Sequence, residues 1–553
     1  MTLQRLVIVL IVFAFGNVRA EFSNPIIPGY APDPSVVRVG EDYYLTNSTF
    51  EYFPGLPIYH SRDLVNWTLI GHALHRESQV DLDTADSSGG VHAPTIRYHD
   101  GLFYVIVTNI VHNKPVNFIV TAEDPAGPWS DPYVLKDAPG IDPSLLFDDD
   151  GRAWYTGNWH PPYATSPGQT EIWLQELDLD TMQLTGERHI LWGGCCGGDY
   201  VEGPHLYKKD DTYYLLVAEG GTGFEHAVTI ASSNSPFGPF KSNPRNPILT
   251  HRNLSYSHPI TGVGHADLVD TPDGRWYAVA LGWRLLESEH GILGRETFLA
   301  PVTWETEPYD WKESKDTWPV IAPDTGRIEL RNPMPFAGTR QTLETSFRDD
   351  FDGEELGGEW NMRRTHDYPF HEVHDGKLRL KANAGSIDRQ ARYSFLGIRQ
   401  RDFQYTATTR MAFRDYDDND EAGLVLMQND RSAITFTNEG GTLRVRRFAK
   451  GQWSEIAKAS FTSSPGVSNI LSIRVNALSA DFLAGLPGDD PVLVAGDVDL
   501  RSLSPAEIDG FNYTGIYIGL YATGQGSDSP AWAEFDYFRY EPVPGVRDAW
   551  YTK

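Results

Sequence analysis

Three short segments of the chain place a carboxylate at the head of the same local pattern. They are Pro32-Asp33-Pro34-Ser35, Ile141-Asp142-Pro143-Ser144 and Val201-Glu202-Gly203-Pro204-His205. Two carboxyl groups that flank a glycosidic bond can hydrolyse it, because one protonates the leaving oxygen while the other activates a water molecule. These residue types therefore point to glycoside hydrolysis, provided that the fold brings the three side chains together.

The elements that follow these carboxylates repeat in the same order. Each carboxylate precedes a strand-like run, a turn and an aromatic-rich strand, at 36–45, 145–155 and 206–216. Two further copies begin at His92-Ala93-Pro94-Thr95 and at His265-Ala266-Asp267. Five repeats of about 50 to 60 residues, built from short strands and turns, are typical of a five-bladed β-propeller. Equivalent residues of successive blades meet around the central axis, so the three carboxylates are expected to converge in one pocket.

The chain divides into two predicted domains, and both are all-β. Residues 21–330 hold the five repeats of the propeller, and the Pro-rich sequence at 331–343 is interpreted as a linker. Alternating strands without the blade pattern follow in 344–545, among them 377–381, 442–446, 470–475 and 515–521. About ten such strands favour a β-sandwich, with Trp532–Phe538 as its closing strand.

Residues 1–20 are predicted to be a secretory signal peptide. Arg5 supplies the positive region, Leu6–Phe15 the apolar region, and Val18-Arg19-Ala20 a cleavage site of small residues. The alternative is a membrane anchor, but about ten apolar residues are too few to span a bilayer. The expected location is therefore secreted and extracellular, with no membrane association after cleavage.

The charge balance limits the class of partner. The formal net charge is −29, which disfavours nucleic acids and anionic membranes as partners. A neutral oligosaccharide or plant cell-wall polysaccharide fits this balance as substrate. Aromatic residues make up 12% of the chain, as expected for all-β domains and for sugar-binding surfaces.

The two cysteines of the chain, Cys195 and Cys196, are adjacent and have glycines on both sides. This spacing fits neither a disulfide scaffold nor a metal site. After export to an oxidising compartment the pair is expected to close a vicinal disulfide, six residues before Glu202, at the rim of the pocket. The alternative is a pair of free thiols.

Stiff backbone around Asp33, which lies between two prolines, suits a base that must hold one water in line. Glu202 suits the acid, which needs a raised pKa from desolvation or from a neighbouring like charge. Asp142 is expected to supply that charge and to orient Glu202. The alternative for a lone Asp-Pro is a turn cap, and for a lone glutamate a solvated surface carboxylate.

Four further residues are weaker candidates. Phe50 is expected to offer a ring to the sugar, and His92 to contact a hydroxyl. Arg295 is expected to bind sugar hydroxyls or a carboxylate, with a structural salt bridge as the alternative. His265 is expected either to ligate a calcium ion near the propeller axis or to be a hydrogen-bonded core histidine.

Together these motifs resemble glycoside hydrolase family 43, over essentially the whole mature chain. The resemblance extends to the run 48–67 and to His205-Leu206-Tyr207-Lys208. It implies that Asp33 is the general base, Asp142 the aspartate that modulates the pKa and orients the acid, and Glu202 the general acid. It also implies that Arg295 is a pocket arginine of exo-acting members and that His265 lies near an axial ion.

The second domain resembles the concanavalin-like sandwich of the family's β-xylosidases and α-L-arabinofuranosidases, which helps to close the pocket. One departure concerns the wall of the sugar subsite, where His92 stands in place of the tryptophan that many β-xylosidases carry before Ala-Pro.

The sequence thus predicts an inverting exo-glycosidase that releases a terminal pentose, D-xylose, from xylo-oligosaccharides or arabinoxylan. One alternative is an α-L-arabinofuranosidase acting on arabinoxylan, arabinan or xyloglucan side chains. Another is a non-catalytic carbohydrate-binding propeller. No cofactor is required by this chemistry, and a structural Ca²⁺ at His265 is compatible with the pattern.

Overall fold

The computed structural model describes residues 20–544, apart from 197–198, 309–314, 367, 390–391, 418, 461–467 and 511. Strands dominate, and the helical elements of this part of the chain are the short 3-10 turns η1 (Ile387–Arg389), η2 (Arg501–Leu503) and η3 (Pro505–Glu507). None of the described helices has the length and apolarity to span a membrane. The predicted signal peptide, except for Ala20, falls outside the described residues.

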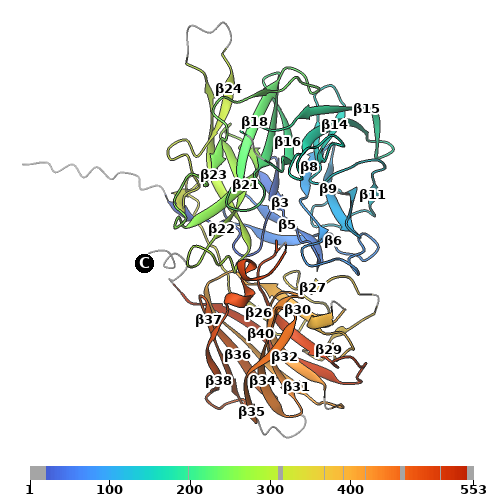
Figure 1. Cartoon of the computed structure of the whole chain (residues 1–553), viewed down its shortest axis with the longest axis vertical. Coiled ribbons are helices and arrows are strands. Elements are labelled where there is room, and N and C mark those ends of the chain that lie inside the picture. The colour runs from blue at the N-terminus through green and yellow to red at the C-terminus, as the bar shows by residue number, and fades with distance from the viewer. Residues whose placement is uncertain are drawn as a thin grey trace, which may run out of the picture.

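Residues 35–321 form five antiparallel sheets of four or five strands, the five-bladed propeller that the repeats predict (Figure 1). Blade 1 contains β2 (Ser35–Val39), β3 (Asp42–Thr46), β5 (Gly55–Ser61) and β6 (Thr68–Leu74). Blade 2 contains β7 (Gly90–Val91), β8 (Thr95–His99), β9 (Leu102–Val111), β10 (Lys114–Ala122) and β11 (Tyr133–Val134). Blade 3 contains β12 (Ser144–Phe147), β13 (Ala153–Trp159), β14 (Glu171–Asp178) and β15 (Gln183–Trp192).

Blade 4 contains β16 (Glu202–Lys209), β17 (Thr212–Glu219), β18 (Ala227–Ser233), β19 (Lys241–Ser242) and β20 (Leu249–Thr250). Blade 5 contains β21 (Ile260–Asp270), β22 (Trp276–Arg284), β23 (Arg295–Thr306) and β24 (Thr317–Ile321). The first strands β2, β12, β16 and β21, together with β8, contact one another in a closed ring. Residues at the starts of these strands therefore face a common centre.

A largely buried ion pair connects the strands of that ring. The guanidinium of Arg97, on β8, donates hydrogen bonds to Asp267 Oδ2 (2.9 Å) and Ser35 Oγ (3.2 Å), and its Nη2 lies 3.0 Å from His205 Nδ1. These partners belong to blades 5, 1 and 4, so a single cation joins four blades at the axis. Tyr207 donates a further hydrogen bond to Asp267 Oδ1 (2.6 Å).

The C-terminal domain is the predicted β-sandwich, and its apolar residues form one large core between two sheets. One sheet contains β26 (Phe347–Asp349), β28 (His371–His374), β29 (Lys377–Lys381), β31 (Gln404–Phe413), β36 (Asn469–Asn476), β37 (Ser479–Gly485), β38 (Val492–Asp499) and β40 (Trp532–Pro542). The other contains β30 (Ser394–Arg399), β32 (Glu421–Asn429), β33 (Ser432–Glu439), β34 (Thr442–Ala449), β35 (Gln452–Ser460) and β39 (Tyr517–Thr523).

The segment expected only as a linker contains a strand. β25 (Arg331–Pro333) pairs antiparallel with β1 (Glu21–Ser23), the first strand after the predicted signal. The Met334 N–H continues this pairing by donating to the Ala20 carbonyl (2.8 Å). The exit of the propeller is therefore tied to its entry.

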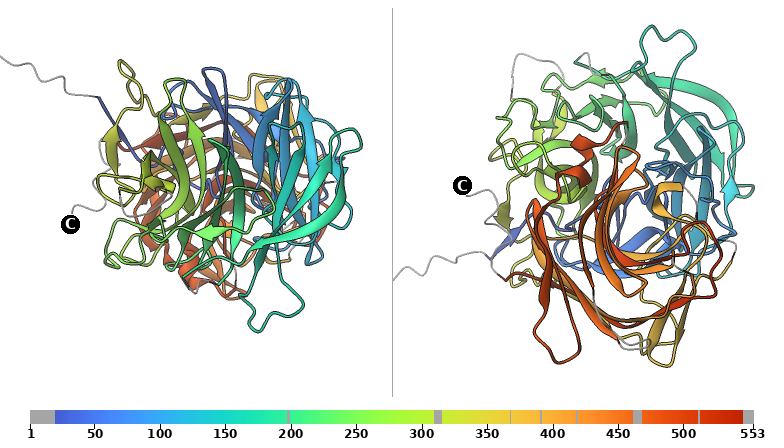
Figure 2. Two further views of the ribbon diagram at one scale, coloured as in Figure 1. Left: turned by 90° about the horizontal axis from the view of Figure 1, so that it is seen from above. Right: turned by 60° about the horizontal axis from the view of Figure 1, so that its bottom comes forward.

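The sandwich packs along one side of the propeller, and specific contacts fix the two domains together (Figures 1 and 2). β27 (Met362–Arg363) pairs with β4 (Tyr52–Phe53) of the propeller. Arg363 donates to Glu51 Oε1 (2.9 Å), and the rings of Tyr52 and Tyr517 stack at 3.9 Å. This interface brings a loop of the second domain to the pocket described next.

Candidate active site

All seven residues singled out in the sequence line one pocket on the propeller, with a cavity volume of about 110 Å³. The pocket is lined by Asp33, Phe50, His92, Ala93, Ile141, Asp142, Glu202, Thr222, His226, His265, Arg295 and Tyr513. The carboxylates of blades 1, 3 and 4 thus converge as the repeats predict. Five of the lining residues, Ala93, Ile141, Thr222, His226 and Tyr513, were not singled out by the sequence.

A shared backbone conformation explains how the blades present these side chains. Asp33, Asp142 and His265 each lie just before or within the first strand of a blade, and their φ angles are 51°, 55° and 45°. This left-handed region is unfavourable for residues other than glycine. Backbone strain of this kind persists only where the surrounding structure imposes it, and it is concentrated at functional sites.

Asp33 is held in its ionised form. Arg295 Nη1 donates to Asp33 Oδ1 (2.8 Å), Ser48 Oγ donates to Asp33 Oδ2 (2.6 Å), and His265 Nδ1 lies 3.6 Å from Oδ1. Burial alone would raise the pKa of Asp33, but the charge of Arg295, followed by His265 and the Ser48 hydrogen bond, outweighs burial and lowers it. A carboxylate in this state can accept a proton from water.

Glu202 has the opposite electrostatic character. Desolvation, followed by the negative charge of Asp33, raises its pKa to about 7, while Arg295 opposes the shift. At neutral pH a substantial share of Glu202 is therefore protonated, as a general acid requires.

Asp142 is the third carboxyl group of the pocket, and it interacts electrostatically with Glu202. Its own pKa is raised well above the usual range by burial, then by Glu202, then by Asp33. Because Coulomb repulsion is mutual, Asp142 and Glu202 raise each other's pKa, and Asp33 adds a second negative charge beside Glu202. Asp142 and Glu202 behave as a pair that retains a proton, and the Gly203 N–H holds Asp142 by donating to Oδ2 (3.1 Å).

One wall of the pocket is aromatic and crosses the domain boundary. The Arg295 guanidinium lies 5.7 Å from the Phe50 ring and 5.3 Å from the ring of Tyr513, which belongs to the second domain. The Phe50 ring contacts His92 edge-on at 4.8 Å. Phe50 is only 2% exposed, so its ring shapes the wall more than it offers a broad open face.

The missed residues Thr222 and His226 lie in the connection between β17 and β18. Thr222 Oγ1 accepts a hydrogen bond from Arg295 Nη1 (2.9 Å). His226 is 1% exposed, its Nδ1 lies 3.2 Å from the Gly262 carbonyl, and its Nε2 has no hydrogen-bond partner within the described chain. The glycine-rich run Gly220-Gly221-Thr222-Gly223 was the available signal for this loop.

His265 is packed as a neighbour of the base. A Cβ on Gly203 would approach His265 Nε2 to 2.8 Å, so the ring requires glycine at that position. Across the described residues no three His, Cys, Asp or Glu side chains are grouped suitably for a metal ion. The charged group next to His265 is the carboxylate of Asp33, whose Oδ1 lies 3.6 Å from Nδ1, and the calcium site suggested for His265 stays a prediction.

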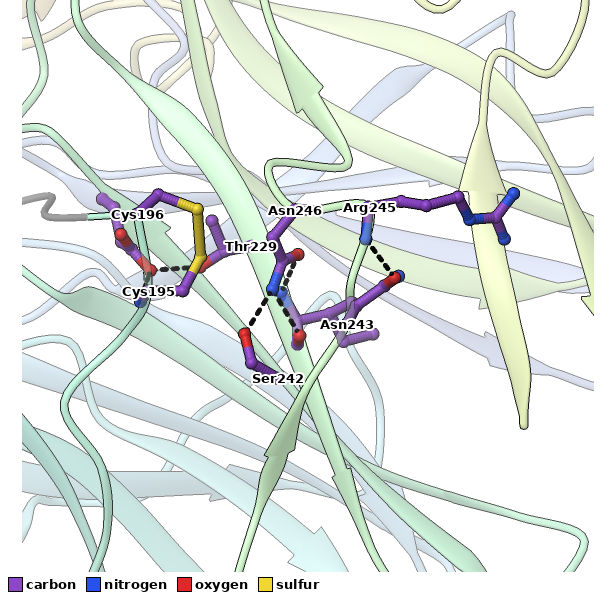
Figure 3. The surroundings of a disulfide bond; sticks show 9 residues. Cys195, Cys196, Thr229, Ser242, Asn243, Arg245 and Asn246 are labelled. Carbon is purple, nitrogen blue, oxygen red and sulfur yellow. Dashed lines mark hydrogen bonds between the residues drawn. A yellow bond between two sulfur atoms is a disulfide. The ribbon is translucent and has the colours of Figure 1, made fainter. Parts of the chain in front are cut away.

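The expected vicinal disulfide is present, and Figure 3 shows Cys195 and Cys196 bonded beside Thr229. The Cys195 N–H donates to Glu219 Oε1 (2.8 Å), which also accepts from the Thr229 hydroxyl. Glu219 is 1% exposed at the end of β17. The loop that leads into Glu202 is thus attached to the interior of blade 4.

Comparisons with known proteins agree with this geometry. The model of glycosyl hydrolases family 43 matches residues 22–308, and that of the β-xylosidase C-terminal concanavalin A-like domain matches 348–541. A xylosidase/arabinosidase of Butyrivibrio fibrisolvens is 42% identical, covering 94% of this chain and 99% of the relative. A non-reducing end α-L-arabinofuranosidase of Bacteroides ovatus is 38% identical, covering 97% and 98%.

Solved structures superpose over both domains. The crystal structure of a xylan β-1,4-xylosidase from Bacillus halodurans gives a TM-score of 0.86 at 33% identity, covering 94% of this chain and 99% of that one. The resemblance inferred from the motifs is therefore confirmed. The chain belongs to glycosyl hydrolase family 43 and is a glycoside hydrolase of the β-xylosidase and α-L-arabinofuranosidase type.

Proposed function

We propose that this protein is an inverting exo-glycosidase that removes terminal D-xylose from xylo-oligosaccharides or arabinoxylan. The observation that carries the proposal is the pocket in which an ionised Asp33 and a protonatable Glu202 share a cavity of about 110 Å³. Tyr513 of the second domain lines the same cavity, which favours a chain end over the middle of a polymer.

In the proposed reaction Asp33 accepts a proton from water as that water attacks the anomeric carbon. Glu202 donates its proton to the glycosidic oxygen as the bond to the leaving group breaks. Arg295 keeps Asp33 ionised, and Asp142 keeps Glu202 protonated and in place. Water and protons suffice for every step.

An α-L-arabinofuranosidase is the second candidate. The relatives from Butyrivibrio fibrisolvens and Bacteroides ovatus carry arabinosidase or arabinofuranosidase in their names. His92, in the pocket wall where many β-xylosidases have tryptophan, also leaves the identity of the sugar open to this alternative. The mechanism proposed above applies to both sugars.

Initial rates on xylobiose and on an arabinofuranosyl-substituted xylo-oligosaccharide distinguish the two candidates, with Glu202→Gln as the inactive control. Dominant xylose release supports the proposal. Dominant arabinose release would change the assigned sugar to arabinofuranose but leave the proposed mechanism unchanged. Proton NMR of the first product reports the anomeric configuration. Release of the same anomer as the substrate would overturn inversion.

Export is part of the proposal and rests on the sequence of residues 1–20. Expression of the full chain in a secreting host, followed by N-terminal sequencing of the medium fraction, tests it. A mature protein that begins at Glu21 is expected, and retention of the uncleaved chain inside the cell would contradict it.

A further inference from the structure

Two exposed aromatic side chains, Tyr200 and Tyr256, and the half-buried Phe224 lie on the connections before, within and after blade 4. The rings of Phe224 and Tyr256 stack at a centroid distance of 4.5 Å with 29° between their planes. Tyr256 is 71% exposed, and Tyr200, in the loop before β16, is 44% exposed. Single exposed aromatics are common, but a stacked pair presents one pre-arranged apolar face to solvent.

The segment that carries Phe224 adjoins the active-site pocket. Phe224 lies two residues from Thr222 and two from His226, and both of these line the pocket. Two residues of extended chain span at most about 7 Å, so the backbone of Phe224 is held close to the pocket wall. The Tyr200 ring lies against the same loop, because a Cβ on Gly221 would be 3.4 Å from it.

The position of the acid Glu202 indicates which part of the substrate contacts the aromatic face of Phe224 and Tyr256. Glu202 must reach the glycosidic oxygen, so the leaving part of the substrate lies on the Glu202 side of the pocket. Glu202 is the first residue of β16, and the flanking connections carry Tyr200 and Phe224. These two connections are themselves joined, since the Gly220 N–H donates to the Asp199 carbonyl (2.7 Å).

We propose that Phe224, Tyr256 and Tyr200 form a platform for the leaving group, which binds the second and later sugars of an oligosaccharide. The apolar C–H faces of sugar rings would stack on the exposed rings, while the pocket holds the terminal sugar. The inference rests on the proposed function, and it specifies oligosaccharides rather than short glycosides as the preferred substrates.

The test compares substrates with and without a sugar as leaving group. The fluorides of β-D-xylopyranose and α-L-arabinofuranose place one atom beyond the pocket, whereas xylotetraose and the matching arabino-tetrasaccharide place three sugars there. Tyr256→Ala and Phe224→Ala are expected to lower kcat/KM for the hydrolysed tetrasaccharide about tenfold. Hydrolysis of the fluoride is expected to stay within about twofold of the wild type, which also shows that the variants fold.

Tyr416→Ala is the matched control, because Tyr416 is 66% exposed but lies in the second domain and outside the pocket lining. This variant is expected to leave kcat/KM unchanged for both the tetrasaccharide and the fluoride. Unchanged kcat/KM for the tetrasaccharide in both platform variants, with normal fluoride hydrolysis, would overturn the platform alone. A wild-type protein that hydrolyses neither fluoride would overturn the proposed function itself.

Discussion

Arg295 Nη1 lies 2.8 Å from Asp33 Oδ1, and this ion pair joins the third strand of blade 5 to the start of blade 1. The same nitrogen donates to Thr222, and the guanidinium faces the ring of Tyr513 from the second domain. A single side chain therefore sets the charge state of the base and connects it to the acid's blade and to the second domain.

Replacing Arg295 by glutamine is expected to move the acid limb of the kcat/KM profile to higher pH. The base works only when ionised, and Arg295 is the principal group that lowers the pKa of Asp33. Its loss should also reduce kcat/KM at neutral pH by about 100-fold, the usual effect of removing a preorganised charged donor. Arg295→Lys, which keeps the charge, should shift the limb less. An acid limb that stays in place in the glutamine variant would contradict this role.

Variants of the acid and variants of the base should respond differently to a change of leaving group. Glu202→Gln is expected to lower kcat on xylobiose by about 10³-fold, because the alkoxide leaving group needs a proton. It should largely spare xylosyl fluoride, since fluoride leaves without protonation. Asp33→Asn should lower kcat on both substrates, because water must be activated in each case. If Glu202→Gln lost as much activity on xylosyl fluoride as on xylobiose, as Asp33→Asn is expected to do, the assignment of Glu202 as the acid and Asp33 as the base would be contradicted.

Activity at high pH should be limited by Glu202. The acid acts in its protonated form, so kcat/KM is expected to fall as the pH rises through about 7, the pKa of Glu202. Asp33 acts in its ionised form, and its lowered pKa extends activity into acidic solution. The profile should therefore be a broad bell with its alkaline limb near neutrality.

Asp142→Asn should move that alkaline limb to lower pH. Asp142 and Glu202 repel each other when both are ionised, so removing one carboxyl makes loss of the proton from the other easier. The pH dependence of kcat/KM on a fluoride and on xylobiose measures the effect, and only the xylobiose profile should respond. An alkaline limb that does not move would show that burial and Asp33 alone set the pKa of Glu202.

The blades, and the residues that repeat with them, could be predicted from the sequence. Asp33, Asp142, Glu202 and His265 occupy corresponding places in successive blades, and the ring of first strands brings such places together whatever the outer strands contain. The strand at 377–381 could likewise be predicted, because apolar and polar residues alternate with period two where one face of a strand is buried.

Contacts that depend on the other domain or on irregular loops could not be predicted from the sequence. Tyr513 comes from a loop of the sandwich that carries no blade pattern, and Thr222 and His226 lie in a connection without a strand period. Nor does the repeat show which carboxyl is nearest to which charge. The raised pKa of Asp142 itself, which burial raises more than the charges of Glu202 and Asp33 do, could not be predicted for that reason, since it requires distances and burial rather than order along the chain.

The interface between the domains should be essential to stability as well as to the pocket. Arg363 and Arg364 are buried with Glu51 and Asp430 in a balanced group of four charges, in which Arg363 contacts both carboxylates. Arg363→Met would leave a buried negative charge without compensation, and breaking such a pair costs about 3–5 kcal/mol. Urea denaturation should show this loss in the free energy of unfolding.

The exposed pair of Arg62 and Glu41 provides the matched control. The Arg62 side chain is 65% exposed and that of Glu41 79%, so Arg62→Met should change stability by no more than about 0.5 kcal/mol. Because Tyr513 reaches the pocket only across this interface, Arg363→Met should also raise KM for xylobiose before unfolding begins. Unchanged stability and KM in Arg363→Met would mean that the hydrophobic and aromatic contacts, such as the stack of Tyr52 on Tyr517, hold the domains together without the ion pairs.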